Sequence, residues 1–309
     1  MILQEDTMKK LLVSALALLV LVGCGAQGSK SSESIKVYTR DGSSGTREAF
    51  ESIIGLESLT SNSAETTSNG DMAKQVSSSP AGIGYVSLTT DFEANELTPV
   101  SYEGVNPTVE TVNNGTYKLA RPFSFVTRAA GDFGSQEKEQ LVAAFLDYLV
   151  NSTEGRQVVL AAGGIVDVGA GKPWSELKAN HPIVDQDNSG ITLKTGGSTS
   201  VDKTITAAVQ SFIPMAGNFK FEPNHTGSGD GFKRTLGGEK DGANAIDIGF
   251  ASRAFKSEET VASGLMSGEY AKDAVVVVVP VKNDAIKDLT AAQLVEIFSG
   301  NAKTWADIK

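Results

Sequence analysis

Short apolar runs alternate with segments of helical periodicity along most of the chain. The run Ile35–Thr39 predicts a strand, and apolar residues at helical spacing between Ala49 and Ile54 predict a helix soon after it. The run Ile191–Thr195 is followed in the same way by a helical pattern over residues 201–212. Strands that alternate with amphipathic helices indicate an α/β architecture.

Further segments continue this alternation. Apolar runs predict strands at Ala81–Leu88, Arg121–Thr127, Ala245–Ala251 and Ala274–Val281. The last two are apolar enough to be buried parallel strands. Helices are expected after Ser135 and from Thr290 to Gly300. Between about residues 165 and 190 the pattern dissolves into a stretch rich in Gly, Pro, Asn and Asp, which is typical of a connector with one short helical turn.

Length and composition are those of a globular protein with room for two domains. The chain has 309 residues, and a domain has roughly 150. Its hydrophobic fraction of 40% and charged fraction of 21% are ordinary. The net charge of −10 argues against nucleic acid and against an anionic membrane surface as partners. Any anion must therefore be bound by local geometry against the overall field.

The N-terminus carries the features of an export signal. Two lysines precede an apolar run over residues 11–22, which is shorter than the about 20 residues of a transmembrane helix. The run ends in "LVGC", which resembles a bacterial lipoprotein signal-peptidase site, and Cys24 is the only cysteine. We expect a signal peptide over residues 8–24, lipidation of Cys24 and a flexible tether over 25–34. The alternative is a buried helix with an incidental cysteine.

Three segments place Gly, Ser and Thr where a helix is expected to begin. They are "RDGSSGTR" (Arg40–Arg47), "GGSTS" (Gly196–Ser200) and "TGSGDG" (Thr226–Gly231). A helix N-terminus has unpaired N–H groups and a partial positive charge, and arginine adds charge-assisted hydrogen bonds to an oxyanion. Each loop alone is more simply explained by helix capping. Their recurrence favours an anion site. The first two loops also follow strands directly, which places them at the carboxyl ends of strands, where open α/β sheets bind ligands.

The sequence gives little support to catalysis. Its two histidines, His181 and His225, belong to no recognisable metal-ligand spacing, and no GxSxG motif is present. The Gly-rich loops do not have the spacing of a nucleotide-binding loop. We therefore expect no enzyme activity, cofactor or metal, and a bound phosphate would be cargo.

Four more stretches, together with these loops, carry a resemblance to a known family. They are "IGFASRAFKSEE" (Ile248–Glu259), "LTAAQLVEIFSGNAKTWADI" (Leu289–Ile308), "SSSPAGIGYVSL" (Ser77–Leu88) and "GVNPTVETVNNGTYKLARPF" (Gly104–Phe123). The chain resembles the phosphate-binding lipoproteins of bacterial Pst-type ABC transporters. The resemblance implies a type II periplasmic-binding-protein fold, in which two α/β lobes close on inorganic phosphate. It also implies an extracytoplasmic monomer, lipid-anchored at the outer face of the cytoplasmic membrane, which delivers phosphate to an ABC permease.

The order of segments differs from the usual order of that family. There the "GSTS" half comes first, whereas here it follows the "RDGSSGTR" half, so the chain resembles a circular permutant whose connector spans residues 165–190. One lobe is then expected from residues 35–96 plus 274–309 and the other from 97–273. Ile35 and Lys309 should lie close together. A rearranged gene is the alternative.

The resemblance also implies the ligand-binding residues. They are Arg40, Ser44, Gly45, Thr46, Ser198, Thr199, Ser200, Ser228, Gly229, Asp230, Ser252 and Arg253. Some family members have an aspartate at the positions of Gly42 and Arg253, where it accepts the proton of hydrogen phosphate. Asp41 and Asp230 are the available substitutes, and both could equally be helix caps. Arg253 could touch the ligand or hold the surface of its lobe, and Arg47 could touch the ligand, close the lobes or lie in solvent.

These departures leave the identity of the bound oxyanion open. Sulfate, molybdate or another tetrahedral oxyanion is the first alternative to phosphate. A secreted phosphate-ester hydrolase is the second, and it would require a base or metal cluster beside the loops.

Overall fold

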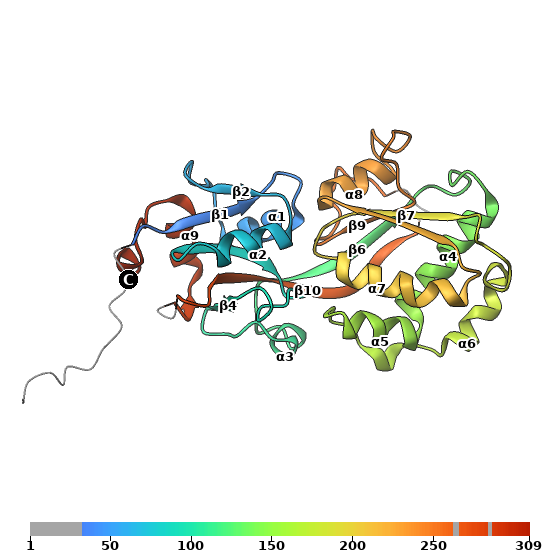
Figure 1. Cartoon of the computed structure of the whole chain (residues 1–309), viewed down its shortest axis with the longest axis horizontal. Helices are drawn as coiled ribbons and strands as arrows, with labels where there is room; N and C mark the ends of the chain where they lie inside the picture. Colours follow the sequence, from blue (N-terminus) through green and yellow to red (C-terminus); the bar gives the residue numbers. More distant parts are fainter. Residues whose placement is uncertain (1–32, 262–265, 284–285) are drawn as a thin grey trace, which may run out of the picture.

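The computed structural model describes residues 33–261, 266–283 and 286–309. The expected signal peptide, its lipidation site Cys24 and most of the tether lie outside the described residues. Within them, no helix is long and apolar enough to cross a membrane. The chain forms two lobes side by side, which are joined by extended strands (Figure 1).

The main sheet of the described chain runs through both lobes in the order β2-β1-β3-β10-β6-β9-β7-β8, with β4 also paired to β10. Its strands are β1 (Lys36–Arg40), β2 (Ala64–Thr66), β3 (Gly82–Ser87), β4 (Leu97–Pro99), β6 (Ala120–Thr127), β7 (Thr192–Gly197), β8 (Lys220–His225), β9 (Ile248–Ala251) and β10 (Ser267–Pro280). Strand β1 is parallel to β2 and β3, and β7 is parallel to β8 and β9. A separate pair joins β5 (Ser101–Tyr102) to β11 (Asp288–Leu289).

Strand β10 does not run parallel to its neighbours, contrary to the prediction for its apolar run. It is antiparallel to both β3 and β6, and β9 is antiparallel to β6 although parallel to β7. The apolar run was correctly taken as buried, because residues 273–280 are buried throughout. Apolarity on both faces reports burial and carries no information on the direction of neighbouring strands.

Helices pack against the sheet in each lobe (Figure 1). They are α1 (Gly45–Ile54), α2 (Asn69–Ser77), α3 (Val109–Asn113) and α9 (Ala291–Ser299) in the first lobe, and α4 (Gln136–Asn151), α5 (Thr153–Ala161), α6 (Trp174–Leu177), α7 (Asp202–Phe212) and α8 (Ser228–Thr235) in the second. Local signals set their ends as expected. The side chains of Ser135 and Thr290 cap α4 and α9, and Gly300 ends α9 in the left-handed region with φ 82°.

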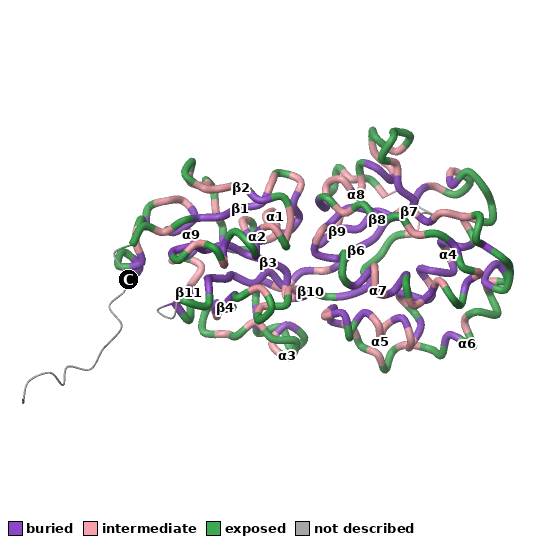
Figure 2. The backbone as a smooth tube through the Cα atoms, viewed as in Figure 1, coloured by how far each residue is buried: buried purple, intermediate pink, exposed green. Residues whose placement is uncertain are grey.

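Two hydrophobic cores define the lobes, and Figure 2 shows the buried backbone of each. The first core draws on residues 37–119 and 274–308, and the second on residues 123–271 apart from Ile165, which packs in the first. The boundary expected after residue 96 is therefore wrong, since Leu97 and Leu119 lie in the first core. Within the described residues, the chain passes from one lobe to the other in β6 and returns in β10, which we call the crossing strands.

The connector over 165–190 is more ordered than its composition suggests. Besides α6, it forms short 3-10 turns at Val168–Ala170, Lys178–Asn180 and Pro182–Asp185. Trp174 and Ile183 are buried in the second core, and the Trp174 ring packs edge-on against Tyr148 and Phe212. The connector is therefore part of the second lobe's core.

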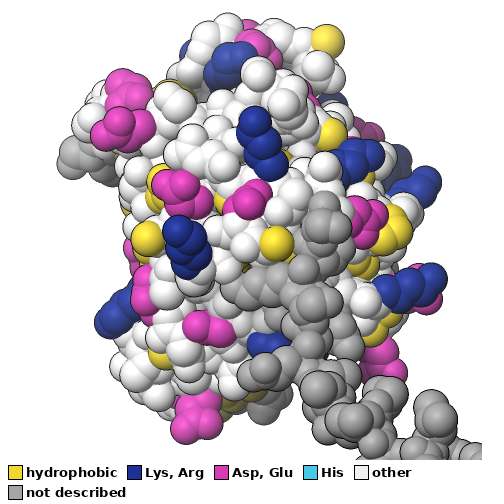
Figure 3. Space-filling model, turned by 90° about the vertical axis from the view of Figure 1, so that its left-hand side faces the viewer, with side chains coloured by type: hydrophobic (Ala, Val, Ile, Leu, Met, Phe, Trp, Pro, Cys, Tyr) yellow, Lys and Arg dark blue, Asp and Glu magenta, His cyan; other side chains and the backbone are white. Residues whose placement is uncertain are grey.

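The described N-terminal segment lies beside the end of the chain, as expected. The Ile35 N–H donates to the Lys303 carbonyl at 2.8 Å, and Ser34 forms an antiparallel bridge with Thr304. The C-terminus lies next to this segment in Figure 1. At this end of the first lobe, acidic and basic side chains are interspersed over the surface (Figure 3).

Candidate functional site

The end of β1 and the start of α1 form the first loop of the site. The Asp41 carboxylate accepts the Ser43 N–H at 2.9 Å, which closes a tight turn directly after Arg40. Ser44 then caps α1, because its hydroxyl accepts the Arg47 N–H. This local chemistry turns the strand into a helix within four residues and aims the helix N-terminus at the junction between the lobes.

Arg40 is the buried cation of this loop, with 1% of its surface exposed. Its Nη1 donates to Thr199 Oγ1 at 3.3 Å, and its Nη2 donates to Asp41 and to the Thr67 carbonyl at 3.3 and 3.2 Å. Its Nε is buried without a hydrogen-bond partner among the described residues. Burial lowers the pKa of the Arg40 guanidinium, Asp41 opposes this, and nearby Arg121 adds to it. The cation is thus only partly compensated.

Three buried serines of the second lobe face this loop, and we call them the serine cluster: Ser198, Ser228 and Ser252. The Ser252 hydroxyl lies 2.9 Å from that of Ser198 and 3.3 Å from that of Ser228, whose oxygen also accepts the Ser252 N–H. Gly197 at the end of β7 makes this approach possible. Its φ is 108°, and a Cβ there would lie 2.0 Å from the Phe250 carbonyl oxygen.

The two lobes touch at these loops, so the structure is closed. Thr46 Oγ1 lies 3.0 Å from Ser200 Oγ, and the Gly229 N–H donates to the Ser43 carbonyl at 3.1 Å. Gly45 packs directly against the serine cluster. The N-terminal ends of α1 and α2 from one lobe and of α7 and α8 from the other therefore meet at one place (Figure 1). Four such ends create a locally positive environment in an acidic protein.

Asn69 and Arg121 also reach this junction, and neither was expected from the sequence. The Asn69 amide nitrogen lies 3.3 Å from Thr199 Oγ1 and 2.9 Å from Ser200 Oγ, and Arg121 Nη2 donates to Ser200 Oγ at 3.0 Å. An arginine inside a predicted buried strand was the signal that could have revealed Arg121. Asn69 gave no signal beyond its place at a helix start.

Arg121 pairs with Asp273 where the crossing strands meet. The two residues are register partners, and Nε and Nη2 of Arg121 lie 2.9 and 2.7 Å from Asp273 Oδ2. Asp273 is 0% exposed, and its Oδ1 accepts from the Ser87 hydroxyl and the Leu88 N–H. Burial lowers the pKa of Arg121, and Asp273 opposes this. The pair connects the anion junction to both crossing strands.

Two expected ligand residues are engaged elsewhere. Nη1 and Nη2 of Arg253 bind the Glu259 carboxylate at 2.6 and 2.8 Å. Its Nε lies 3.0 Å from Glu48 Oε2 of the other lobe, an ion pair without a hydrogen bond. Arg253 therefore closes the lobes. The Asp230 carboxylate accepts from Thr226. Arg47 binds Glu51 within its own helix and donates to the Arg40 carbonyl.

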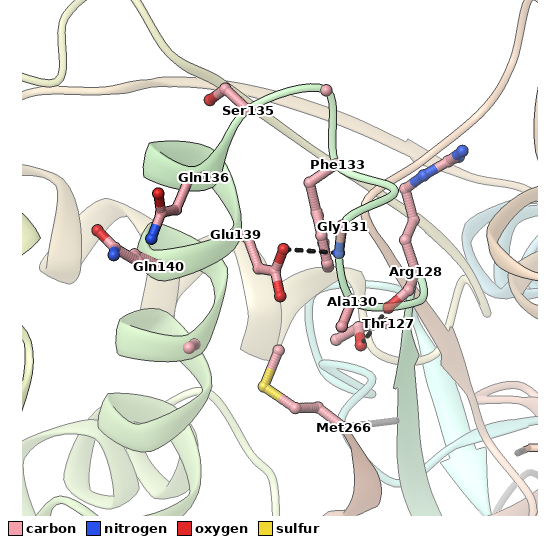
Figure 4. Close-up of a pocket in the computed structure, with 12 residues that line it drawn as sticks. Thr127, Arg128, Ala130, Gly131, Phe133, Ser135, Gln136, Glu139, Gln140 and Met266 are labelled. Carbon is pink, nitrogen blue, oxygen red and sulfur yellow. Dashed lines mark hydrogen bonds between the residues drawn. The ribbon is translucent and has the colours of Figure 1, made fainter. Parts of the chain in front are cut away.

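Two cavities help to place the site. One of about 330 Å³ opens beside Thr199 and Ser200 and is also lined by Asn69 and Thr89. A larger one, about 660 Å³, lies elsewhere in the second lobe, between the start of α4 and the loop after β6. Figure 4 shows that the Arg128 guanidinium points away from that larger cavity and that Glu139 accepts the Gly131 N–H. Its charged groups are thus already committed.

Comparison with known proteins shows the family. A family model described as a PBP superfamily domain matches residues 26–153 and 180–309. The phosphate-binding protein PstS 2 of Streptococcus agalactiae serotype V is 30% identical over 300 residues, which cover 94% of this chain and 93% of that protein. The chain belongs to the PstS family of the PBP superfamily.

Other PstS proteins and a solved structure agree with this. PstS 2 of Streptococcus pneumoniae serotype 4 is 29% identical over 305 residues, covering 94% of each chain. The crystal structure of a phosphate ABC transporter phosphate-binding protein from S. pneumoniae TIGR4 superposes with a TM-score of 0.63 and 25% identity, over 89% of this chain and all of that one. The two-lobed α/β fold expected from the sequence is therefore confirmed.

The PstS relatives also bear on the order of segments. The alignment with the S. agalactiae protein covers 94% of this chain and 93% of that protein. A sequence alignment pairs residues in chain order, so the two proteins carry corresponding segments in the same order. PstS of Staphylococcus epidermidis aligns over only 159 residues, 50% of this chain and 43% of that protein. The order found here is thus shared by other PstS proteins, which disfavours an accidental gene rearrangement.

Proposed function

We propose that this protein captures inorganic phosphate between its lobes and delivers it to an ABC permease. The observation that carries the proposal is the partly compensated Arg40, buried where four helix N-termini and a set of hydroxyl groups meet between closed lobes. Such a junction suits a compact oxyanion, because guanidinium, hydroxyl and backbone N–H groups are all donors. The names of the PstS relatives and of the TIGR4 structure support phosphate as the ligand.

The proposed anion contacts come from both lobes. Arg40, Ser44, Gly45 and Thr46 supply one half-site, and Ser198, Thr199, Ser200, Ser228, Gly229 and Ser252 supply the other. An open form would expose each half separately, whereas the closed form brings them together. The anion binds the closed form better because only that form offers both half-sites, so binding shifts the population toward closure.

Asp41 is the better placed of the two candidate proton acceptors. Its carboxylate lies 3.3 Å from Arg40 Nη2, inside the first loop, whereas Asp230 bonds to Thr226 at the edge of the third. We therefore propose Asp41 rather than Asp230 as the group that meets a protonated phosphate oxygen. We leave Arg253 out of the anion contacts, since two carboxylates already occupy its guanidinium.

We further propose that the protein acts as an extracytoplasmic binding protein rather than an enzyme, as a monomer anchored through a lipid on Cys24. The LVGC sequence supports the anchor. We also propose that its segment order is a circular permutation of the order in those PstS proteins that align with only about half of this chain, such as that of Staphylococcus epidermidis. The adjacency of Ile35 and Lys303, the packed connector and the half-length match to the Staphylococcus relative support this.

The test is calorimetric titration of wild type and Arg40→Ala with inorganic phosphate, with sulfate and molybdate as competitors. Wild type should bind phosphate, and the variant should lose most of its affinity, because hydroxyl and N–H donors alone leave the anion charge uncompensated. Equal phosphate affinity in the two proteins would refute the role of Arg40. Turnover of a phosphate ester by the wild type would favour the hydrolase alternative.

A further inference from the structure

The orientation of the Asn69 amide is determined by its surroundings. Its Oδ1 accepts the backbone N–H of Ser87 at 3.0 Å. Because a backbone N–H can only donate, the oxygen must face Ser87 and the NH₂ group must face Thr199 and Ser200. The amide therefore donates to both hydroxyl oxygens, across the junction from the opposite lobe.

Arg121 makes a second contact of the same polarity. A guanidinium has no acceptor, so Arg121 Nη2 donates to Ser200 Oγ at 3.0 Å. Asp273 holds the guanidinium in place from the neighbouring crossing strand. Arg121 Nη1 is buried without a hydrogen-bond partner among the described residues, so part of its donor capacity at this place is unused.

These contacts use up the acceptor capacity of both hydroxyl groups. A hydroxyl oxygen has two lone pairs and one proton. Ser200 Oγ accepts from Asn69 and Arg121, and Thr199 Oγ1 accepts from Asn69 and Arg40. Each hydroxyl can therefore only donate its own proton. Ser200 donates it to Thr46 Oγ1 here, at the place where we put the anion.

We propose that Asn69 and Arg121 are positioning residues that fix Thr199 and Ser200 as hydrogen-bond donors toward the ligand. The closed site then selects an oxyanion that presents unprotonated oxygens to these hydroxyl groups. A protonated ligand oxygen there would place two donors face to face. The inference rests on the proposed function and adds a specificity to it: phosphate dianion is favoured over phosphate monoanion.

The test measures the affinities of inorganic phosphate and of sulfate, across the pH range in which the monoanion of phosphate loses its proton. Besides Arg121 and Asp273, charged or titratable side chains near the two hydroxyl groups include Arg40, Asp41, Asp71, Asp202, Lys203 and His225. The elements that meet at the junction also carry Arg47, Glu48, Glu51, Lys74, Glu222, Asp230, Lys233, Arg234 and Arg253. Their titration affects both anions, whereas only phosphate changes its own protonation. The ratio of the two affinities therefore reports the protonation of the ligand, and the Asn69 variants separate the share of the two hydroxyl groups from that of Asp41.

In the wild type, phosphate affinity relative to sulfate should fall as the pH is lowered. Asn69→Ala frees one lone pair on each hydroxyl, so it should weaken sulfate and phosphate dianion by about tenfold and flatten the pH dependence of the ratio. Asn62→Ala, at an exposed asparagine of the same lobe, is the matched control and should leave both unchanged. Asn69→Asp keeps the acceptor for Ser87 but replaces the donor, and should bind phosphate dianion more weakly than Asn69→Ala.

The outcomes separate this inference from the function beneath it. If the wild type binds neither anion, the proposed function fails and this inference fails with it. If the wild type binds phosphate but Asn69→Ala lowers the affinities for phosphate and for sulfate by the same factor at every pH, Asn69 merely holds the lobes together. The inference alone is then overturned. Matched thermal unfolding of the variants confirms that each is folded during the titrations.

Discussion

Gly45 provides a direct way to block closure without disturbing either lobe. A Cβ at this position would lie 2.2 Å from Ser228 Oγ and 2.7 Å from Ser228 Cβ, both on the opposite lobe. A rotamer change of Ser228 relieves only the first contact, because its Cβ is fixed by the backbone. The clash therefore exists in the closed form and disappears when the lobes separate.

The size of the effect follows from this geometry. Overpacking of this kind costs about 1–3 kcal/mol. Since the cost falls on the closed form alone, Gly45→Ala should weaken anion binding by about 5- to 150-fold. Gly45 is the first residue of α1, where alanine is compatible with the helix and restricts the unfolded chain more than glycine does. The open protein should therefore be at least as stable as the wild type.

The assay combines phosphate titration with small-angle scattering, which reports the separation of the lobes. Gly45→Ala should scatter as a more extended particle and bind phosphate weakly, with an unchanged or raised melting temperature. Gly42→Ala is the control, because the same added methyl group in the same loop meets no atom within 4 Å. Wild-type affinity and a closed scattering profile in Gly45→Ala would refute the assignment of this contact to the lobe junction.

Three further variants test other parts of the structure. Asp273→Ala leaves the buried guanidinium of Arg121 unpaired and should lower the free energy of unfolding by about 3–5 kcal/mol in urea denaturation; a loss below about 1 kcal/mol would contradict the buried pair. Glu48→Gln removes the carboxylate that contacts Arg253 across the lobes; because Glu48 is 42% exposed, phosphate affinity should fall only about twofold, and the difference from wild type should vanish in high salt. Burial lowers the pKa of His225, so the unfolded chain takes up a proton first as the pH falls. The contribution of His225 to the free energy of unfolding should be complete above about pH 6.5 and decline below it. The melting temperature of His225→Gln should therefore fall less than that of the wild type as the pH is lowered, and an identical fall would exclude His225 as the cause.

Local patterns in the sequence predicted the elements and the loops, because these depend on neighbours along the chain. Ser44, Ser135 and Thr290 cap helices as expected from their positions before apolar helical patterns. The three Gly- and Ser-rich loops do meet. The prediction that they meet depended on the family resemblance, since periodicity alone does not say which loops share a sheet edge.

Contacts between distant segments could not be read in this way. The direction of β10 depends on its partners, and the first core extends to Leu119 because β4 and β5 pair with C-terminal strands. Arg253 stands in a family-like motif, yet Glu259 and Glu48 capture its guanidinium. Asn69 acts through a hydrogen bond to a backbone group of β3, which no local pattern reveals.

The most direct test of the central claim is a crystal structure of the protein, expressed from residue 25 onward, grown with inorganic phosphate. We predict a tetrahedral anion between the lobes, bound by the Arg40 guanidinium on one side and by Thr199 and the serine cluster on the other. An anion found instead in the 660 Å³ cavity beside Phe133, or held by one lobe alone, would contradict the account.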